Sequence, residues 1–283
     1  MGDHFKHCTA LVREVDRDRY LATLFAPVDK RDALFALYAF DVEILRVRDL
    51  AREPMPGEIR LQWWREMLLG ERATEAAANP VSAALSETLT RYDLSSERLI
   101  DLIEARRFDV YNEPMSGFEA LRSYALRTEG SIFELAARIL AGGIGSATPG
   151  LSATAGEAKT IANVLALLPH HAARRQLYVP LEVLRHYQAD PDDIFAMRVT
   201  PELRAALAEL RLRARRNLAL IGSASADIPV VARPSFLPLA PLRRWLLELD
   251  RPDYDPFHPP HTTPWRKQWC IWRAAKSFRR IGA

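Results

Sequence analysis

Two adjacent histidines, His170 and His171, are the side chains whose type first suggests chemistry, because imidazole nitrogen is a common zinc ligand. Neighbouring residues on a helix point about 100° apart, and no third ligand stands at a suitable spacing nearby. A solvated or hydrogen-bonded pair is therefore favoured over a zinc site. The rest of the sequence contains no glycine-rich phosphate loop, no cysteine cluster with metal spacing and no Gly-x-Ser-x-Gly elbow.

Other charged and aromatic side chains have ordinary structural explanations. Arg46 stands one turn before Asp49, so an ion pair within a helix accounts for Asp49. Trp63 and Trp64 lie beside basic residues, and packing explains them most simply. We expect one of them in the core and one at its rim.

The elements that must position these side chains are helices. Apolar residues recur at three- and four-residue steps along most of the chain, and no alternating run bounded by hairpin signals competes with that period. Proline and glycine punctuate the periodic segments. We therefore predict an all-α fold, with helices over residues 31–49, 57–69, 81–92, 96–111, 118–140, 155–168, 201–221 and 238–249.

Composition limits the function classes. The 283 residues carry a formal net charge of +3, which is too small for this length to indicate nucleic-acid binding. Cys8 and Cys270 cannot build a disulfide framework and fit a cytoplasmic setting. The N-terminus has no secretory apolar region, and no apolar run reaches the roughly 20 residues of a membrane span. Without a tether-like linker, we expect one domain over residues 1–264 and an appendage over residues 265–283.

The appendage is rich in tryptophan and basic residues. Trp265, Trp269 and Trp272 follow a helical spacing of four and then three, with Arg273 and Lys276 among the surrounding basic residues. Such a helix is typical of the surface of an anionic membrane, where each basic residue adds on the order of 1 kcal/mol. The alternative is that the tryptophans cover the core and the basic tail is solvated.

A set of motifs extends from about Asp18 to about Pro180. They are Ala36-Leu37-Tyr38-Ala39-Phe40, Trp63-Trp64-Arg65, residues 124–130, Asn163, and Arg174 with Tyr178-Val179-Pro180. These motifs resemble the squalene/phytoene synthase family, the head-to-head prenyl diphosphate condensing enzymes. The resemblance implies the isoprenoid-synthase fold, a helical bundle around a central cavity. It also implies two facing helices whose aspartate-rich motifs hold Mg²⁺ against the substrate diphosphates.

Most carboxylates are missing at these motif positions. The resemblance places the first motif at Leu45, Arg46 and Asp49, and the second motif at residues 167–171, where Leu167 and His171 stand in the acid positions. Leucine cannot coordinate a hard cation, and histidine is a weak ligand for Mg²⁺. We therefore expect no metal site, no cofactor, no catalytic residue and no metal-dependent condensation, with Asp49 as a relic of the metal position.

A narrower resemblance refines this expectation. Residues 38–43 with Arg48-Asp49, residues 168–175 and residues 253–259 are similar to the branch of the family that contains the mitochondrial complex I assembly factor. This implies a non-catalytic factor in the assembly of respiratory complex I (NADH dehydrogenase). Its partner would be a complex I subunit or assembly intermediate, and it would lie in the cytoplasm or peripherally on the inner membrane. The alternative is an active prenyl diphosphate transferase of the squalene or phytoene synthase type, which needs Mg²⁺.

One binding hypothesis follows from the exchange of acids for bases. If the two motif helices still face each other, a formerly negative cavity is now positive and binds the head group of an anionic lipid or isoprenoid directly. The candidates for its lining are Tyr38, Arg46, Asn163, His170, His171, Arg174, Arg175 and Tyr178. The alternative is that these side chains point to solvent.

Overall fold

A buried helix, α3 (Val28–Leu50), organises the N-terminal part of the protein in the computed structural model, which describes residues 2–51, 53–143 and 148–282. All residues from Ala33 to Val42 are buried, so this stretch of α3 is covered on every side. The sequence predicts this, because apolar residues occupy most of its circumference. Every element in the described ranges is helical and no strand occurs there, which confirms the all-α prediction.

The chain divides into two compact units. The first comprises Met1–Tyr111, Ser131–Ser152 and Ala226–Pro238, and the second comprises Asn112–Gly130, Ala153–Ser225 and Leu239–Ala283. The division into a domain over residues 1–264 and an appendage over residues 265–283 stays a prediction.

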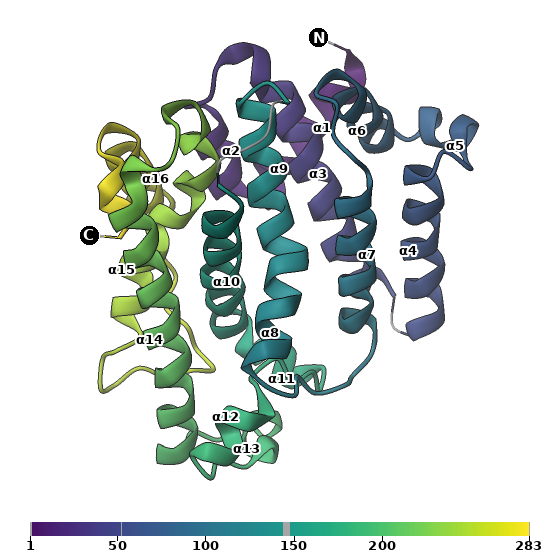
Figure 1. Ribbon diagram of the computed structural model, residues 1–283. Coiled ribbons are helices and arrows are strands. Elements are labelled where there is room, and N and C mark those ends of the chain that lie inside the picture. The colour runs from purple at the N-terminus through teal and green to yellow at the C-terminus, as the bar shows by residue number, and fades with distance from the viewer. Residues whose placement is uncertain (1, 52, 144–147, 283) are drawn as a thin grey trace. The chain divides into compact units, whose positions relative to one another are not determined.

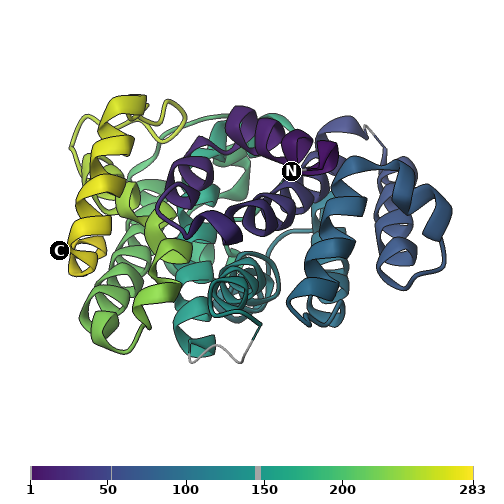
Figure 2. The ribbon, with the colours of Figure 1, turned by 90° about the horizontal axis from the view of Figure 1, so that it is seen from above.

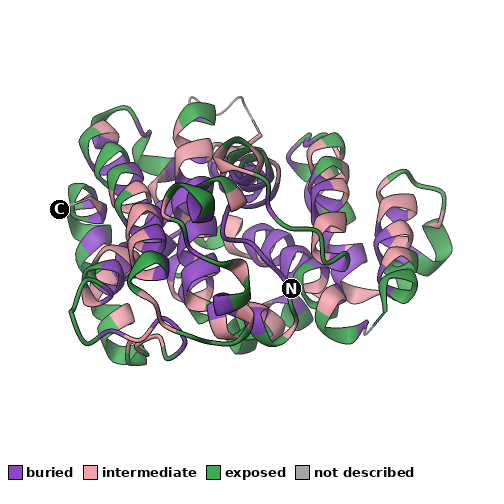
Figure 3. Cartoon of the chain, turned by 90° about the horizontal axis from the view of Figure 1, so that it is seen from below, coloured by how far each residue is buried: buried purple, intermediate pink, exposed green. Residues whose placement is uncertain are grey.

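In the first unit, α3 packs against several helices at once. Figure 2 shows α1 lying along α3, and Figure 1 shows α4 beside α7. Figure 3 shows that buried residues line the faces where such helices meet, while exposed residues lie on the outer faces. The other helices of the unit are α1 (Asp3–Val15), α2 (Arg17–Thr23), α4 (Pro54–Leu68), α5 (Ala73–Ala78), α6 (Pro80–Arg91), α7 (Glu97–Val110), α9 (Ser131–Leu140) and most of η3 (Val230–Leu239).

The second unit is built around another long helix, α14 (Pro201–Ser223), which packs against α12, α15 and η4. Gly222 and Gly282 let α14 and the chain end approach closely, because a Cβ added at Gly222 would lie 2.8 Å from Gly282 Cα. The other elements are α8 (Phe118–Ala125), η1 (Leu126–Gly130), most of α10 (Pro149–Ala166), α11 (Leu168–Ala173), α12 (Leu181–His186), α13 (Pro191–Phe195), most of η2 (Ala224–Ala226), α15 (Ala240–Glu248), α16 (Pro264–Lys276) and η4 (Phe278–Ile281).

Some helix boundaries differ from the prediction. The helix expected over residues 118–140 contains a π-helical turn, η1, which separates α8 from α9. Thr128 Oγ1 bonds back to the carbonyl of Tyr124 at 2.7 Å within this turn. The helix expected over residues 155–168 breaks at Leu167, because Pro169 has no N–H to continue its hydrogen bonds. The helix expected from residue 57 begins at Pro54 instead, since proline suits the first turn of a helix.

Further helices were not predicted by the apolar period, namely α1, α2, α5, α11, α12 and α13. Most of them are too short to show a period clearly. None of the helices within the described ranges is both long and apolar enough to cross a membrane.

Candidate functional site

The first motif segment lies at the C-terminal end of α3. Leu45 is 39% exposed, and Arg46 and Asp49 are also exposed. The structure records no ion pair between Arg46 and Asp49, both of which it describes, so the ion pair expected within this helix is not formed. This end of α3 therefore presents one apolar, one basic and one acidic side chain to solvent.

One turn earlier, α3 carries a buried ion cluster that sequence reasoning missed. Arg19 Nη1 donates to Asp41 Oδ2 at 2.6 Å, and Asp41 is fully buried. Arg106 Nη2 lies 3.8 Å from Asp41 Oδ1 and Arg106 Nη1 donates to Asp109 at 3.3 Å. Tyr38 is buried with its ring 5.0 Å from the Arg19 guanidinium. Tyr38 is thus part of a packed charged cluster in the first unit.

The second motif segment surrounds the break between α10 and α11. Leu167 is 46% exposed, whereas His171 packs its ring 4.4 Å from that of Tyr178. Tyr178 in turn packs against Tyr124 at 6.2 Å between ring centroids. Burial lowers the pKa of His171 to about 4, helped by the positive charges of His170 and Arg174. His171 is therefore neutral at pH 7 and supplies no positive charge.

The remaining candidates of this segment point to different neighbours. Asn163 Nδ2 donates to Glu129 Oε1 at 3.3 Å, and Glu129 is buried in η1. Arg175 has a left-handed backbone (φ 52°), and its guanidinium lies 4.6 Å from the Phe195 ring. His170 is exposed. The structure thus brings His171 and Tyr178 together but turns Arg175 toward α13.

The zinc hypothesis for the two histidines gains no support. The rings of His170 and His171 lie 6.3 Å apart at 61°. Among the residues that the structure describes, no group of three or more His, Cys, Asp or Glu side chains could hold a metal ion.

Residues 253–259, which also resemble the assembly-factor branch of the family, have a structural role. Tyr254 and Phe257 are buried, and Arg204 of α14 donates to the Tyr254 carbonyl at 2.5 Å. Burial raises the pKa of the Tyr254 hydroxyl to about 12. Asp255 and His258 pair at 2.8 Å at the surface of the same loop. This loop packs against α14 and shows no cluster of reactive groups.

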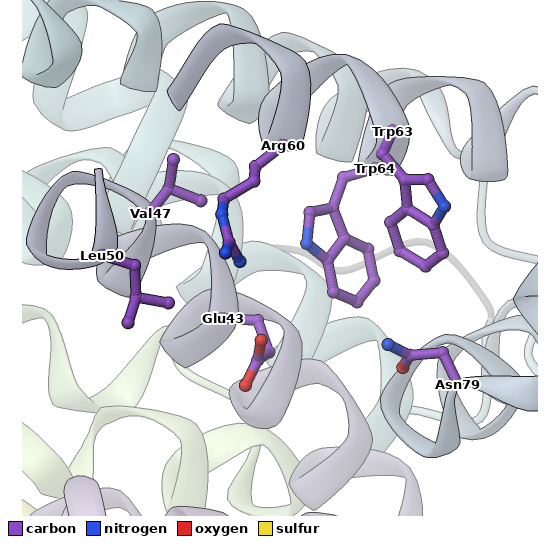
Figure 4. Close-up of a pocket in the computed structure, with 7 residues that line it drawn as sticks. All are labelled: Glu43, Val47, Leu50, Arg60, Trp63, Trp64 and Asn79. Carbon is purple, nitrogen blue, oxygen red and sulfur yellow. The ribbon is translucent and has the colours of Figure 1, made fainter. Parts of the chain in front are cut away.

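A pocket of about 220 Å³ opens in the first unit between α3, α4 and the start of α6. Figure 4 shows the Arg60 guanidinium extending from α4 toward α3 beside the indole of Trp64, with Glu43 on α3 and Trp63 on α4 also in the lining. The complete lining is Glu43, Val47, Leu50, Arg60, Trp63, Trp64 and Asn79.

The tryptophans of this pocket are held by their neighbours. Trp64 is 5% exposed and meets Phe40 edge-on, with ring centroids 5.3 Å apart. Trp63 is half-buried, packs edge-on against Trp64 at 5.0 Å and donates from Nε1 to Glu75 at 3.0 Å. The predicted core and rim positions of the two tryptophans are confirmed.

The pocket holds one acid and one base that are not paired. Among the described residues, neither Glu43 nor Arg60 makes a hydrogen bond or an ion pair. Aromatic walls with one cation and one anion suit a small group with an apolar body and a charge. Counting 100° per residue, the stripe of Glu43, Val47 and Leu50 lies about 150° around α3 from Leu45 and Asp49. The pocket therefore opens on a different face of α3 from Leu45 and Asp49, while Arg46 lies between the two faces.

The donor set at the two motifs does not fit Mg²⁺. Asp49 is the one carboxylate among the predicted metal positions, and the others are leucine, arginine and a neutral, partly buried histidine. Mg²⁺ requires near-octahedral oxygen ligation and is held in proteins by carboxylates and phosphates. Arg46 lies in the first unit and Arg174 in the second, and the anion-binding cavity that combines them stays a prediction.

Comparisons with known proteins define the family. The model of the squalene/phytoene synthase family matches residues 12–273. The human "NADH dehydrogenase (ubiquinone) complex I, assembly factor 6" is 28% identical over 258 residues, which cover 91% of this chain and 76% of that protein. The phytoene synthase of Arthrospira platensis is 26% identical over 291 residues, covering 95% of this chain and 92% of the relative.

A solved structure gives the fold. The crystal structure of a dehydrosqualene synthase in complex with ligand superposes with a TM-score of 0.81 at 19% identity, covering 98% of this chain and 96% of that chain. The predicted isoprenoid-synthase-type fold is confirmed. With a family model that matches nearly the whole sequence, this chain belongs to the squalene/phytoene synthase family.

Proposed function

We propose that this chain is a non-catalytic member of its family that serves in the assembly of respiratory complex I. The observation that carries the proposal is the loss of carboxylates at both metal motifs, where Leu45, Arg46, Leu167 and His171 stand. The relationship to the complex I assembly factors supports the same conclusion, at 28% identity to the human protein.

The chemistry of prenyl condensation explains why the lost carboxylates matter. Two diphosphates must be held together and both must leave as anions before the hydrocarbon is formed, which requires concentrated positive charge in a fixed place. In an Mg²⁺-dependent enzyme the carboxylates hold the ions that supply this charge. Asp49 is exposed, and a single carboxylate cannot assemble a metal cluster between two diphosphates. His171 cannot replace an acid, because it is neutral and packed against Tyr178.

The decisive experiment deletes the gene in the source organism and measures respiratory NADH oxidation in membranes together with isoprenoid content. We expect lowered NADH oxidation with normal isoprenoids. Loss of isoprenoids with normal NADH oxidation would contradict the proposal.

Complementation of the deletion with a variant of Asp49 tests whether the function of this protein depends on metal binding. An Asp49→Asn variant should restore NADH oxidation as fully as the wild type, because Asp49 has no metal to hold. Asp29→Asn, an exposed acid at the other end of α3, is the matched control. Failure of Asp49→Asn alone would show that the surviving carboxylate is still needed.

The alternative is an active prenyl diphosphate transferase, which the likeness to the Arthrospira platensis phytoene synthase favours at a similar identity of 26%. Its test is product formation by the purified chain from farnesyl or geranylgeranyl diphosphate with Mg²⁺. Squalene or phytoene at ordinary enzymatic turnover, abolished by Asp49→Asn, would replace our proposal with this one.

A further inference from the structure

Helix α16 presents large aromatic side chains to solvent. Trp265 is 64% exposed, Trp269 is 52% exposed and Trp272 is 36% exposed. The opposite face of the helix buries only Ile271 and Ala274. This is the reverse of an ordinary surface helix, which buries its largest apolar side chains. The outward face of α16 therefore carries a large, partly exposed apolar surface.

The exposed aromatic rings are arranged together with cations. Trp269 and Trp272 stack with their centroids 4.9 Å apart and their planes at 21°. Lys276 Nζ lies 3.9 Å from the Trp272 centroid, and the Arg266 guanidinium lies 5.3 Å from the Trp265 centroid. Counting 100° per residue, Lys276 falls within about 40° of all three tryptophans. Apolar rings and positive charge thus share one stripe.

Positive charge is concentrated in this part of the sequence. Asp255 is the last acidic residue, and the six basic residues that follow it are Arg266, Lys267, Arg273, Lys276, Arg279 and Arg280. Because the whole chain has 39 basic and 36 acidic residues, the rest of the chain carries a formal charge of −3. A surface that attracts α16 by charge must therefore be anionic.

We propose that α16 and η4 form a peripheral membrane-binding face that lies on anionic phospholipid head groups. Tryptophan is favoured at head-group depth, where its ring is buried and its N–H can still find a partner. Basic residues on the same stripe place their charges at the phosphates. This inference goes beyond the proposed function and stands without it.

A lipid surface fits these observations better than a protein groove does. The tryptophans lie along one face of a single helix, the geometry of a helix that rests in the plane of an interface. The helix is also firmly held, because Phe278 and Ile281 of η4 are buried and Gly282 meets α14 closely. Binding through α16 therefore attaches the whole second unit to the membrane.

The test is flotation of the purified full-length chain with phosphatidylcholine vesicles that contain or lack phosphatidylglycerol. We expect binding to the anionic vesicles only. Replacing Trp265, Trp269 and Trp272 together by alanine should weaken partitioning by at least about tenfold, since each indole loses apolar area at the interface. A Leu220→Ala variant, which removes an exposed apolar side chain of α14, is the matched control and should bind as the wild type does.

A charge variant tests the second half of the proposal. Arg273→Glu with Lys276→Glu should weaken binding by at least about 25-fold, from about fivefold for each basic residue lost. Arg122→Glu, an exposed arginine of α8, is the control. Circular dichroism verifies that each variant is folded. The proposal is overturned if the wild type does not bind anionic vesicles or if it binds neutral vesicles equally well. It is also overturned if the triple tryptophan variant and the charge variant both bind as tightly as the wild type.

Discussion

Burial of His171 should make the stability of the protein depend on pH in a predictable direction. Its pKa is lowered from 6.5 to about 4 by burial, so the folded state resists protonation that the unfolded chain accepts. The stabilising effect is complete above the unfolded value of 6.5 and is lost as the pH falls toward 4. Acidification through this window should therefore favour unfolding.

The size of this effect follows from the two pKa values. Each pKa unit corresponds to about 1.4 kcal/mol, so the difference between 6.5 and about 4 corresponds to about 3 kcal/mol once both states are protonated. At pH 5 the unfolded chain is almost fully protonated at this residue while the folded protein is mostly not. The loss there is about 2 kcal/mol relative to pH 7.

Urea unfolding at pH 7 and pH 5, followed by circular dichroism, measures this loss. His171→Phe keeps a ring against Tyr178 and removes the titrating group, so its stability should fall by about 2 kcal/mol less than that of the wild type between the two pH values. His170→Phe, at the exposed neighbour, should keep most of the wild-type pH dependence. Equal losses in the wild type and His171→Phe would refute the reasoning.

Three further variants or treatments test other parts of the structure. Asp41→Ala leaves two buried arginines without their shared carboxylate and should cost about 3–5 kcal/mol of unfolding free energy, whereas the exposed Asp29→Ala should cost little; equal melting temperatures would rule out a stabilising cluster. Gly156→Ala places a Cβ 2.4 Å from the backbone of η1 and should lower the unfolding free energy by about 1–3 kcal/mol. Urea unfolding measures this loss, and an unchanged urea midpoint would contradict it. Burial raises the pKa of Cys8 to about 12, so a thiol reagent at pH 8 should label Cys270 and spare Cys8 until the chain is unfolded; mass spectrometry that finds rapid double labelling of the native protein contradicts this.

Features that depend on local sequence could be predicted. The apolar period indicates α3 within a few residues of its observed bounds, and the core and rim positions of Trp64 and Trp63 follow from ordinary packing. The break after α10 also has a local signal, because Pro169 stands where the helix would continue. In each case the information lies within one or two turns of the residue concerned.

Features that depend on distant partners could not be predicted. The π-helical turn η1 lies where Gly156 of α10 approaches Gly130, and no pattern within residues 118–140 encodes that approach. The buried cluster joins Asp41 to Arg19 and Arg106, which lie on other helices. The contact of His171 with Tyr178 likewise needs the turn between them, so the lowered pKa of His171 has no signal in the sequence alone.

The two faces of α3 have a consequence for how this scaffold can evolve. Leu45, where the family carries an acid, lies with Asp49 about 150° around α3 from the walls of the Glu43–Arg60 pocket, whereas Arg46 lies between the two faces. Substitutions can therefore accumulate on one face of α3 while the residues on its other face are kept. A protein with this fold can in this way lose metal binding on one face of α3 and keep, or gain, a ligand-binding pocket on another face of the same helix.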